Sequence, residues 1–504
     1  MQTDFDAIIV GAGPAGSTAA ILLAQAGWSI ALVEKQTFPR RKVCGECIAA
    51  SNLPLLHALG VGAAFEAGAG AELRRVALLR GARRIVAELP AAADPRWRYG
   101  RALGRETLDT LLLERARTAG ATVLQPWSVQ AIGGVPGAHR CEIRSHEPVL
   151  GAGAQRDEVR AADPALARSP LRAFRSSDTA CERRSNDIDR SAGVEPADRC
   201  ATLRAPIVIA AHGSWEPLPS QRDARRRNRG AEDLFAFKAN FSGAALDEGL
   251  LPVLSFDGGY GGMVVAERGI TTLACCIRAD RLDACRRAAP GVRAGEAVEA
   301  LLRHECAGVA EALRHARRDG PWLASGPLEP GVRLRRDDAL FRIGNAAGEA
   351  HPIIGEGISM AIQSAWLLCA RLIEARPERA CDAAAPDAAP VAGTGSPDPW
   401  RGAAPSVAWQ REIQARYVAD WCRHFVPRLR LAAAFAHAAM RPAAALPLVA
   451  LLGHWPALLT HGAKWGGKLR CAPDAATIGR LAARAAVDRS SVPAPSPASR
   501  AGPA

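Results

Sequence analysis

The fold of this 504-residue chain is decided close to its N-terminus, by the stretch Asp6-Ala7-Ile8-Ile9-Val10-Gly11-Ala12-Gly13-Pro14-Ala15-Gly16. Residues 6–10 form an apolar run that is typical of a buried parallel strand, and the pattern G-x-G-x-x-G then opens a helical segment, residues 14–26. A second apolar strand, residues 28–34, ends on Glu34. This strand, helix and strand predict the first βαβ unit of a Rossmann-like α/β domain.

Each glycine of the motif has a physical reason. Gly11 permits the tight turn from strand to helix, Gly13 lets the backbone approach a pyrophosphate, and Gly16 lets the helix pack close to the strand. The first turn of the helix, which contains Ala15, presents free N–H groups and the positive end of the helix dipole to phosphates. These residues are predicted to bind a dinucleotide.

Glu34 stands at the end of the second strand, where a carboxylate accepts hydrogen bonds from a ribose 2′-OH, and Lys35 follows it at the same edge of the sheet. A carboxylate repels a 2′-phosphate, so the pocket suits FAD or NAD rather than NADP. The motif alone does not choose between these two.

The choice comes from a segment more than 300 residues later, Phe341-Arg342-Ile343-Gly344-Asn345-Ala346-Ala347-Gly348-Glu349-Ala350-His351-Pro352-Ile353-Ile354-Gly355-Glu356-Gly357-Ile358. The glycines at 355 and 357 allow the backbone to approach a planar ring. A long helix that starts near Ile358 points its positive end at that ring, where it would stabilise negative charge on a reduced flavin.

This segment resembles the flavoprotein family that joins the aromatic hydroxylases of the p-hydroxybenzoate hydroxylase type with the geranylgeranyl reductases and the flavin-dependent halogenases. In that family the stretch reads G-D-A-A, then a proline, then G-x-G. The resemblance implies that FAD is the cofactor and that the ribityl chain and the isoalloxazine lie along Gly344, Asn345, Pro352, Gly355, Gly357 and Ile358. Asn345 replaces the usual Asp; it still accepts a hydrogen bond but carries no charge.

Two further stretches extend the resemblance. Arg105-Glu106-Thr107-Leu108-Asp109 is similar to the family's R-x-x-L-D, whose arginine contacts the cofactor, although a solvated arginine at a helix start would give the same pattern. The strand before Ala211-His212-Gly213 resembles the family's strand followed by Asp-Gly. His212 replaces that Asp, so the role of the acid does not carry over, and His212 is equally compatible with an ordinary turn residue.

The loop after the second strand, Phe38-Pro39-Arg40-Arg41-Lys42-Val43-Cys44-Gly45-Glu46, resembles the P-R-x-K-x-C-G-E segment of geranylgeranyl reductases, which lies beside the flavin. Cys44 is therefore a candidate catalytic residue; the alternative is a basic loop that ends in a buried thiol. Glu349 and His351 are candidate proton handlers beside the flavin, or else outward-facing loop residues. Cys44 and Cys47 form C-x-x-C, but no second such pair completes a zinc site, so we expect no metal.

The domain organisation follows from composition and periodicity. The FAD-binding domain is predicted to be discontinuous, and an antiparallel β-sheet substrate domain is expected where Phe235, Phe237, Ala239 and Phe241 alternate with other residues and 263–266 pairs with 271–276. The predicted regions are the FAD-binding domain (1–132, 201–216 and 331–374), a disordered insertion (133–200), the substrate domain (217–330), a linker (375–408), a helical C-terminal region (409–485) and a disordered tail (486–504).

Composition limits the partners. The formal charge is +13, but the arginines are mixed with acids and no basic helix accompanies them, so we expect no nucleic-acid partner. The 13 cysteines lack framework spacing, and no signal peptide or spanning segment is evident, which favours a cytoplasmic protein with reduced thiols. The apolar segment 431–459, flanked by basic residues, could rest on the inner face of a membrane or cap the substrate domain. No feature specifies the oligomeric state.

The reaction stays open between three hypotheses. Only one G-x-G-x-x-G is present, which implies that NAD(P)H docks transiently to reduce the flavin. The first hypothesis is a monooxygenase acting on a small hydrophobic aromatic, polyketide or isoprenoid substrate, and the second is a reductase of a lipid C=C bond. The third is an FAD-binding protein without turnover. Halogenation is disfavoured because W-x-W-x-I-P is absent, and Tyr260 occupies the reductases' Y-x-W-x-F-P position without the Trp and Phe-Pro.

Overall fold

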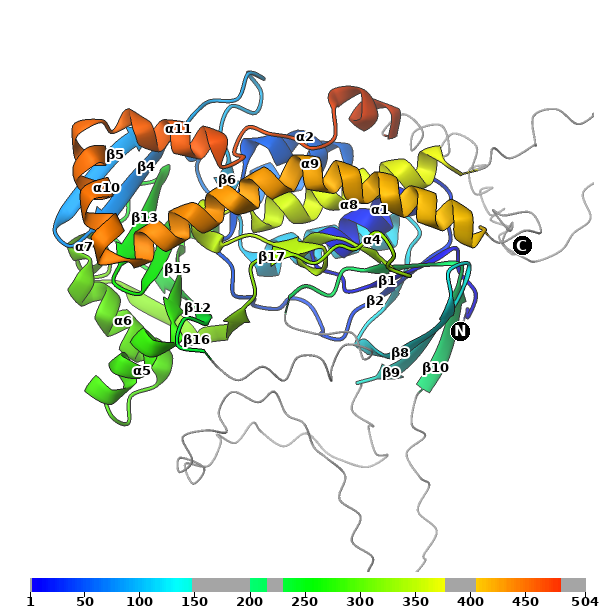
Figure 1. Ribbon diagram of the computed structural model, residues 1–504, viewed down its shortest axis with the longest axis horizontal. Coiled ribbons are helices and arrows are strands. Elements are labelled where there is room, and N and C mark those ends of the chain that lie inside the picture. Colours follow the sequence, from blue (N-terminus) through cyan, green and yellow to red (C-terminus); the bar gives the residue numbers. More distant parts are fainter. Residues whose placement is uncertain (1, 147–199, 215–229, 377–404, 482–504) are drawn as a thin grey trace, which may run out of the picture.

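The computed structural model describes residues 2–146, 200–214, 230–376 and 405–481. Its first sheet has five parallel strands in the order β18-β11-β1-β2-β7. The strands are β1 (Ala7–Val10), β2 (Ile30–Val33), β7 (Thr122–Leu124), β11 (Ile207–Ala210) and β18 (Phe341–Arg342). Helices α1 (Pro14–Gln25), α4 (Arg105–Thr118) and α8 (Gly357–Glu374) pack beside it (Figure 1). Three distant segments thus build one sheet, as predicted.

The second sheet has seven strands in the order β16-β12-β15-β14-β13-β4-β5. They are β4 (Arg75–Arg80), β5 (Arg83–Glu88), β12 (Leu234–Ser242), β13 (Leu250–Phe256), β14 (Gly259–Val265), β15 (Thr271–Arg278) and β16 (Arg317–Leu328). The predicted hairpin is present as β14 and β15. Helices α5 (Ala279–Ala288), α6 (Ala294–Glu305) and α7 (Ala307–Ala312) share a hydrophobic core with this sheet.

The boundaries of the predicted substrate domain need one correction. The hairpin β4–β5, residues 75–88, was assigned to the FAD-binding domain, but it extends the second sheet. Moreover, β4 pairs with β13 in parallel, so the sheet is mixed rather than purely antiparallel. The sequence conceals this pairing because register between strands so far apart depends on packing and not on a local turn signal.

The predicted disordered insertion begins too early in the chain, since residues up to 146 are structured, and its last residue, Cys200, already belongs to a strand. Strands β8 (Trp127–Val135), β9 (Ala138–Ser145) and β10 (Cys200–Ala205) form a three-stranded antiparallel sheet, in which His139, Cys141 and Ile143 are buried. The outward positions of β9 are arginine and glutamate, and these charges hid a short alternating pattern. Residues 147–199 lie outside the described residues.

The C-terminal region is helical, as predicted: α9 (Val407–Met440), α10 (Pro442–His454) and α11 (Ala457–Trp465). Helix α9 runs along α8 and then turns into α10 and α11, which cover the end of the second sheet at β5 (Figure 1). No described helix alone is long and apolar enough to cross a membrane; α9 and α10 pass that test only as a pair bent by 102°. Most of the predicted linker and all of the predicted tail lie outside the described residues.

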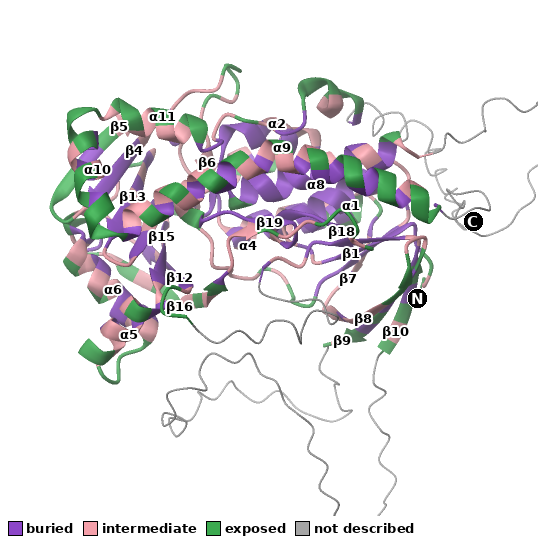
Figure 2. Cartoon of the chain, in the orientation of Figure 1, coloured by how far each residue is buried: buried purple, intermediate pink, exposed green. Residues whose placement is uncertain are grey.

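The remaining elements are short and connect the two sheets. They are β3 (Cys47–Ile48) paired with β6 (Arg101–Ala102), β17 (Gly331–Val332) paired with β19 (Gly348–Glu349), and helices α2 (Leu53–Ala58) and α3 (Gly62–Gly68). Figure 2 shows that the parallel sheet, the central strands of the seven-stranded sheet and α8 are largely buried, whereas exposed residues follow β8–β10 and the outer faces of α9, α10 and α11.

Candidate functional site

A cavity of about 1610 Å³ lies between the parallel sheet, the seven-stranded sheet and the C-terminal helices. Its lining includes the predicted cofactor residues Gly11, Gly13, Ala15, Glu34, Lys35, Arg105, Gly344, Asn345, Pro352, Gly355, Gly357 and Ile358. Gly16 lies behind this surface, where a Cβ atom would stand 1.8 Å from the carbonyl oxygen of Gly11. The fold therefore gathers residues from four separate segments around one space.

The dinucleotide loop has the geometry that its glycines predict. Gly11 adopts φ +102°, and Gly13 precedes α1 without any side-chain cap, so the first N–H groups of the helix have no side-chain acceptor. The buried Glu34 accepts hydrogen bonds from the backbone N–H groups of Ala12 (2.9 Å) and Gln36 (3.0 Å). These bonds fix the carboxylate at the sheet edge where a ribose would lie.

Arg40 is a candidate cofactor-binding residue that the sequence reasoning did not assign. Its guanidinium lies in the cavity wall, 3.6 Å from the Glu34 carboxylate and 3.7 Å from that of Asp109, and stacks on the ring of Phe38. Its side chain is 11% exposed, and its Nε and Nη1 atoms find no hydrogen-bond acceptor among the described residues. Buried donors of this kind suit the oxygen-rich part of a dinucleotide. The Pro39-Arg40 pair of the loop was the sequence signal that could have identified this residue.

Arg105 is not the solvated helix-start arginine of the alternative interpretation. It is buried and forms two hydrogen bonds of 2.7 Å with the Asp109 carboxylate. Burial by itself lowers the pKa of Arg105, but the Asp109 carboxylate outweighs it and raises that pKa, so the guanidinium stays charged. Its Nη2 atom lies 3.8 Å from the place that a Cβ of Gly13 would occupy. A charged donor therefore stands beside the phosphate loop.

Glu46, the last residue of the basic loop, connects that loop to the start of α4 and to the seven-stranded sheet. The residue is buried and has a left-handed backbone conformation with φ +60°. Its carboxylate accepts hydrogen bonds from the backbone N–H of Arg105 (3.0 Å) and the hydroxyl of Thr272 (2.5 Å), and it pairs with the buried Lys238 of β12. The loop therefore has a fixed path along the cavity.

This path places Cys44, a candidate catalytic residue, in the cavity wall. Its sulfur accepts a hydrogen bond from the backbone N–H of Glu46. Its neighbour Cys47 is buried, and burial raises the pKa of the Cys47 thiol to about 11. Cys47 is therefore a protonated thiol, which is unsuited to act as a redox partner or metal ligand. Among the described residues, no group of three side chains could hold a metal ion.

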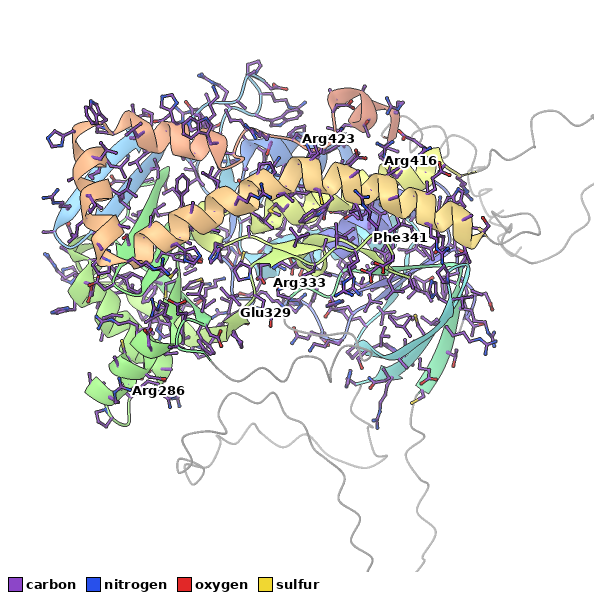
Figure 3. The ribbon with its side chains drawn as sticks, in the orientation of Figure 1. Arg286, Glu329, Arg333, Phe341, Arg416 and Arg423 are labelled. Atoms are coloured by element: carbon purple, nitrogen blue, oxygen red, sulfur yellow. The ribbon has the colours of Figure 1, made fainter. Side chains whose placement is uncertain are left out.

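Asn345 and Glu349 belong to one polar network under the predicted ribityl site. The Asn345 amide donates to the Ser214 hydroxyl (2.8 Å) and to the Glu349 carboxylate (3.3 Å). Glu349 also forms an ion pair of 3.0 Å with Arg333, which is labelled in Figure 3. Glu349 is buried and is therefore not an outward-facing loop residue. A carboxylate that is committed to an arginine holds Asn345 in place more readily than it transfers protons.

His351 is also buried, but it has a different environment. Its Nδ1 atom lies 3.2 Å from the hydroxyl of Tyr260, and its ring packs edge-on against the exposed His437 of α9. Burial, with a smaller contribution from His437, lowers the pKa of His351 to about 4, so the ring is neutral near pH 7. Burial also raises the pKa of Tyr260 well above its ordinary value. Tyr260 thus brings a protonated hydroxyl to the cavity wall.

The loop before α8 is held by the C-terminal region. Glu356 is fully buried; its carboxylate lies 3.5 Å from Lys468 Nζ and 3.8 Å from the guanidinium of Arg428. Lys468 also donates to the carbonyl oxygen of Gly355 at 3.4 Å. These contacts were not predicted, although a lone glutamate between two glycines was a visible signal. His212 lies in the cavity wall after β11, which gives it a place at the site without settling its role.

Comparison with known proteins agrees with this geometry. Residues 4–147 match a family model described as an FAD-binding domain. Residues 4–147 therefore belong to an FAD-binding domain. The family match confirms FAD as the predicted flavin cofactor. The Nε and Nη1 donors of Arg40, which have no acceptor among the described residues, the uncapped N-terminus of α1 and the glycines that line the cavity fit this cofactor.

The relatives differ in the chemistry that their names state. The chain is 34% identical over 119 residues to a menaquinone reductase of Mycobacterium tuberculosis (24% of this chain, 28% of the relative). It is 40% identical over 124 residues to a kynurenine 3-monooxygenase of Stenotrophomonas maltophilia (23% and 26%). These matches span only about a quarter of each relative. The structure of a flavin-dependent brominase superposes with a TM-score of 0.61, covering 97% of this chain and all of that one at 15% identity. This last likeness shows the fold alone.

Proposed function

We propose that the protein is an NAD(P)H-using, FAD-dependent monooxygenase that acts on a hydrophobic aromatic, polyketide or isoprenoid substrate. The observation that carries the proposal is the continuity of the cavity. Beyond the flavin loop its wall consists of apolar side chains from β4, β13, β14 and the C-terminal helices, among them Leu78, Leu251, Met263, Phe435 and Leu452. An apolar space that adjoins a flavin site selects an apolar substrate.

The residues of the chain have distinct tasks in such a reaction. Bound FAD supplies the redox chemistry: it accepts hydride from NAD(P)H and transfers the reducing equivalents onward. The N-terminus of α8 would offset negative charge near the flavin ring, because its first turn has no side-chain cap. The apolar wall keeps water from the reacting atoms, which favours transfer to substrate over loss to solvent.

A C=C reductase is the second candidate, and Tyr260 is the observation that favours it. Reduction of a C=C bond adds hydride to one carbon and a proton to the other. The Tyr260 hydroxyl can donate that proton into the cavity, and His351 at 3.2 Å, beside the exposed His437, can relay a replacement proton from solvent. The cavity position of Cys44 and the local similarity to a menaquinone reductase support the same candidate.

Turnover of the FAD-loaded protein with and without oxygen tests both candidates. The assay would use NADH or NADPH and detergent-dispersed aromatic and isoprenoid compounds. Monooxygenation predicts that turnover requires O₂ and that labelled oxygen from O₂ enters the product. Anaerobic formation of a product with two added hydrogens would instead establish the reductase. A Tyr260→Phe variant should slow reduction at least 10-fold but alter monooxygenation little.

The same assay covers the third hypothesis. A protein that binds FAD yet neither oxidises NAD(P)H nor turns over any of these compounds would be an FAD-binding protein without catalysis. A protein that stays colourless and cannot be reconstituted with FAD would overturn all three.

A further inference from the structure

The outer surface formed by α10 and α11 is apolar although it faces solvent. Five large apolar side chains are exposed there: Leu446 (60%), Leu451 (42%), Trp455 (61%), Leu458 (39%) and Trp465 (56%). They make up half of the exposed large apolar side chains of the described residues. We call this set the apolar ledge. Gathering on one surface distinguishes it from the scattered exposed apolar residues of an ordinary protein.

Helix α10 explains why the ledge needs a partner. Its inner face packs Val449 and Leu452 against Leu78 and Ile85 of the hairpin β4–β5. Its outer face continues with alanine, proline and leucine, and residues 442–463 contain no Asp, Glu, Lys or Arg. A helix that is apolar all round is normally covered on every side. Here the outer face is exposed, as the green segments of α10 in Figure 2 show.

The charges around the ledge point to a negatively charged partner. No Asp or Glu occurs between Asp420 and Asp474, whereas Arg441 and Lys464 flank the two helices closely. Both of these cations are exposed, and Arg441 also pairs with Glu232 at 3.7 Å. On the adjacent strand β5, Arg83 and Arg84 are exposed too; Arg84 pairs with Asp247 at 3.3 Å, and Glu88 is a second neighbouring acid. Lys464 and Arg83 form no ion pair among the described residues, so the cations at the border of the ledge are only partly neutralised. An apolar face bordered by cations is the arrangement that binds anionic lipid surfaces.

The cavity reaches the ledge. Leu458 and Trp465 are exposed to solvent and also line the cavity, so the cavity wall and the ledge share these two residues. Leu448, Leu452 and Leu459 continue the same wall inward. Trp455 and Trp465, at the ends of helices, combine an apolar ring with a polar N–H group, which suits the boundary between lipid tails and headgroups.

We propose that the apolar ledge rests on an anionic lipid bilayer and that the substrate enters the cavity from the membrane. The membrane contact goes beyond the proposed function and does not depend on it; only the statement about substrate entry rests on the proposed function. A second copy of the chain is a poorer occupant because it would bring the same cations face to face.

Sedimentation of the FAD-loaded full chain with lipid vesicles tests the contact. Vesicles of phosphatidylcholine mixed with phosphatidylglycerol should bind the protein, and vesicles of phosphatidylcholine alone should bind it less. Leu446→Ser and Trp455→Ser should each weaken binding about 10-fold, since each removes a side chain that lipid would bury. Lys464→Gln should reduce only the preference for the anionic lipid, by about 5-fold.

The chain offers a matched control. Val135 at the end of β8 is 60% exposed, like Leu446, but belongs to a different sheet, so Val135→Ser should bind vesicles as the wild type does. Retained flavin absorbance and an unchanged melting temperature would show that each variant is folded. Where a serine variant aggregates, Trp455→Phe serves instead: it should keep binding but lose part of the fluorescence quenching caused by brominated lipids.

Three results would overturn the proposal: no binding to either vesicle, equal losses in Val135→Ser and Leu446→Ser, or a dimer that the ledge variants dissociate while vesicle binding stays unchanged. Failure of the proposed function would look different. A flavoprotein without turnover that still binds vesicles would overturn only the proposed function. An active enzyme that does not bind vesicles would overturn only the proposed membrane contact.

Discussion

Replacing Gly16 with alanine tests the geometry of the dinucleotide loop. An added Cβ would lie 1.8 Å from the carbonyl oxygen of Gly11 and 3.2 Å from the Cβ of Ala211. Ordinary contacts of this kind exceed about 3 Å, so α1 must move by roughly 1 Å away from the loop. Overpacking of this size costs about 3 kcal/mol, which corresponds to a fall in melting temperature on the order of 10 °C.

The assay is thermal unfolding of the apoprotein together with titration of FAD by flavin fluorescence. Gly16→Ala should lower the melting temperature without FAD and weaken FAD binding at least 10-fold, because the displaced helix no longer presents its N–H groups. Gly357→Ala is the matched control. No atom lies within 4 Å of its added Cβ, so the apoprotein should keep its stability, while FAD binding should weaken because the methyl group faces the flavin site. An unchanged apoprotein melting temperature for Gly16→Ala would refute the reasoning.

Three further predictions concern charge. Glu34→Lys should reduce the flavin retained on gel filtration at least 10-fold; unchanged retention would show that Glu34 does not bind the ribose. Folding lowers the pKa of His351 from 6.5 to about 4. As the pH drops from 6.5 to 4, the unfolded chain therefore binds a proton that the folded chain does not, and about 3 kcal/mol of folding stability is lost across that window. Urea unfolding of His351→Gln should lack this loss. Arg105→Ala should cost about 3 kcal/mol in the same assay, because the buried Asp109 carboxylate loses both of its arginine hydrogen bonds and keeps only the more distant Arg40 at 3.7 Å. Asp109→Asn added to it should restore part of that stability.

Local sequence signals predicted the βαβ unit and the geometry of its glycine loop, because these features depend on neighbouring residues. The turn at Gly11, the close packing at Gly16 and the acid at Glu34 all lie within one βαβ unit, and each has a backbone reason that a motif records. The later loop around Gly355 was found for the same reason, since only glycine approaches a planar ring without a side chain. The structure brings both stretches to one cavity.

Contacts between distant segments could not be predicted in this way. Glu46 looked like the end of a loop motif, yet its partners Lys238 and Thr272 come from strands about 200 residues away. The pairing of β4 with β13 was missed because a strand's partner is chosen by packing and not by its own pattern. Strand β9 was likewise missed, because its charged outward residues made the segment resemble a disordered one.

The C-terminal region links the apolar ledge to the loop before α8 over a very short distance in the chain. Trp465 belongs to the apolar ledge, and Lys468, three residues later, bonds to the Gly355 carbonyl and pairs with the buried Glu356. Arg428 of α9 holds the same carboxylate from the other side. A displacement of α11 would therefore alter the environment of a buried carboxylate at the start of α8. If the flavin ring binds at that helix start, as we propose, the apolar ledge and the loop at the ring are mechanically connected through Lys468.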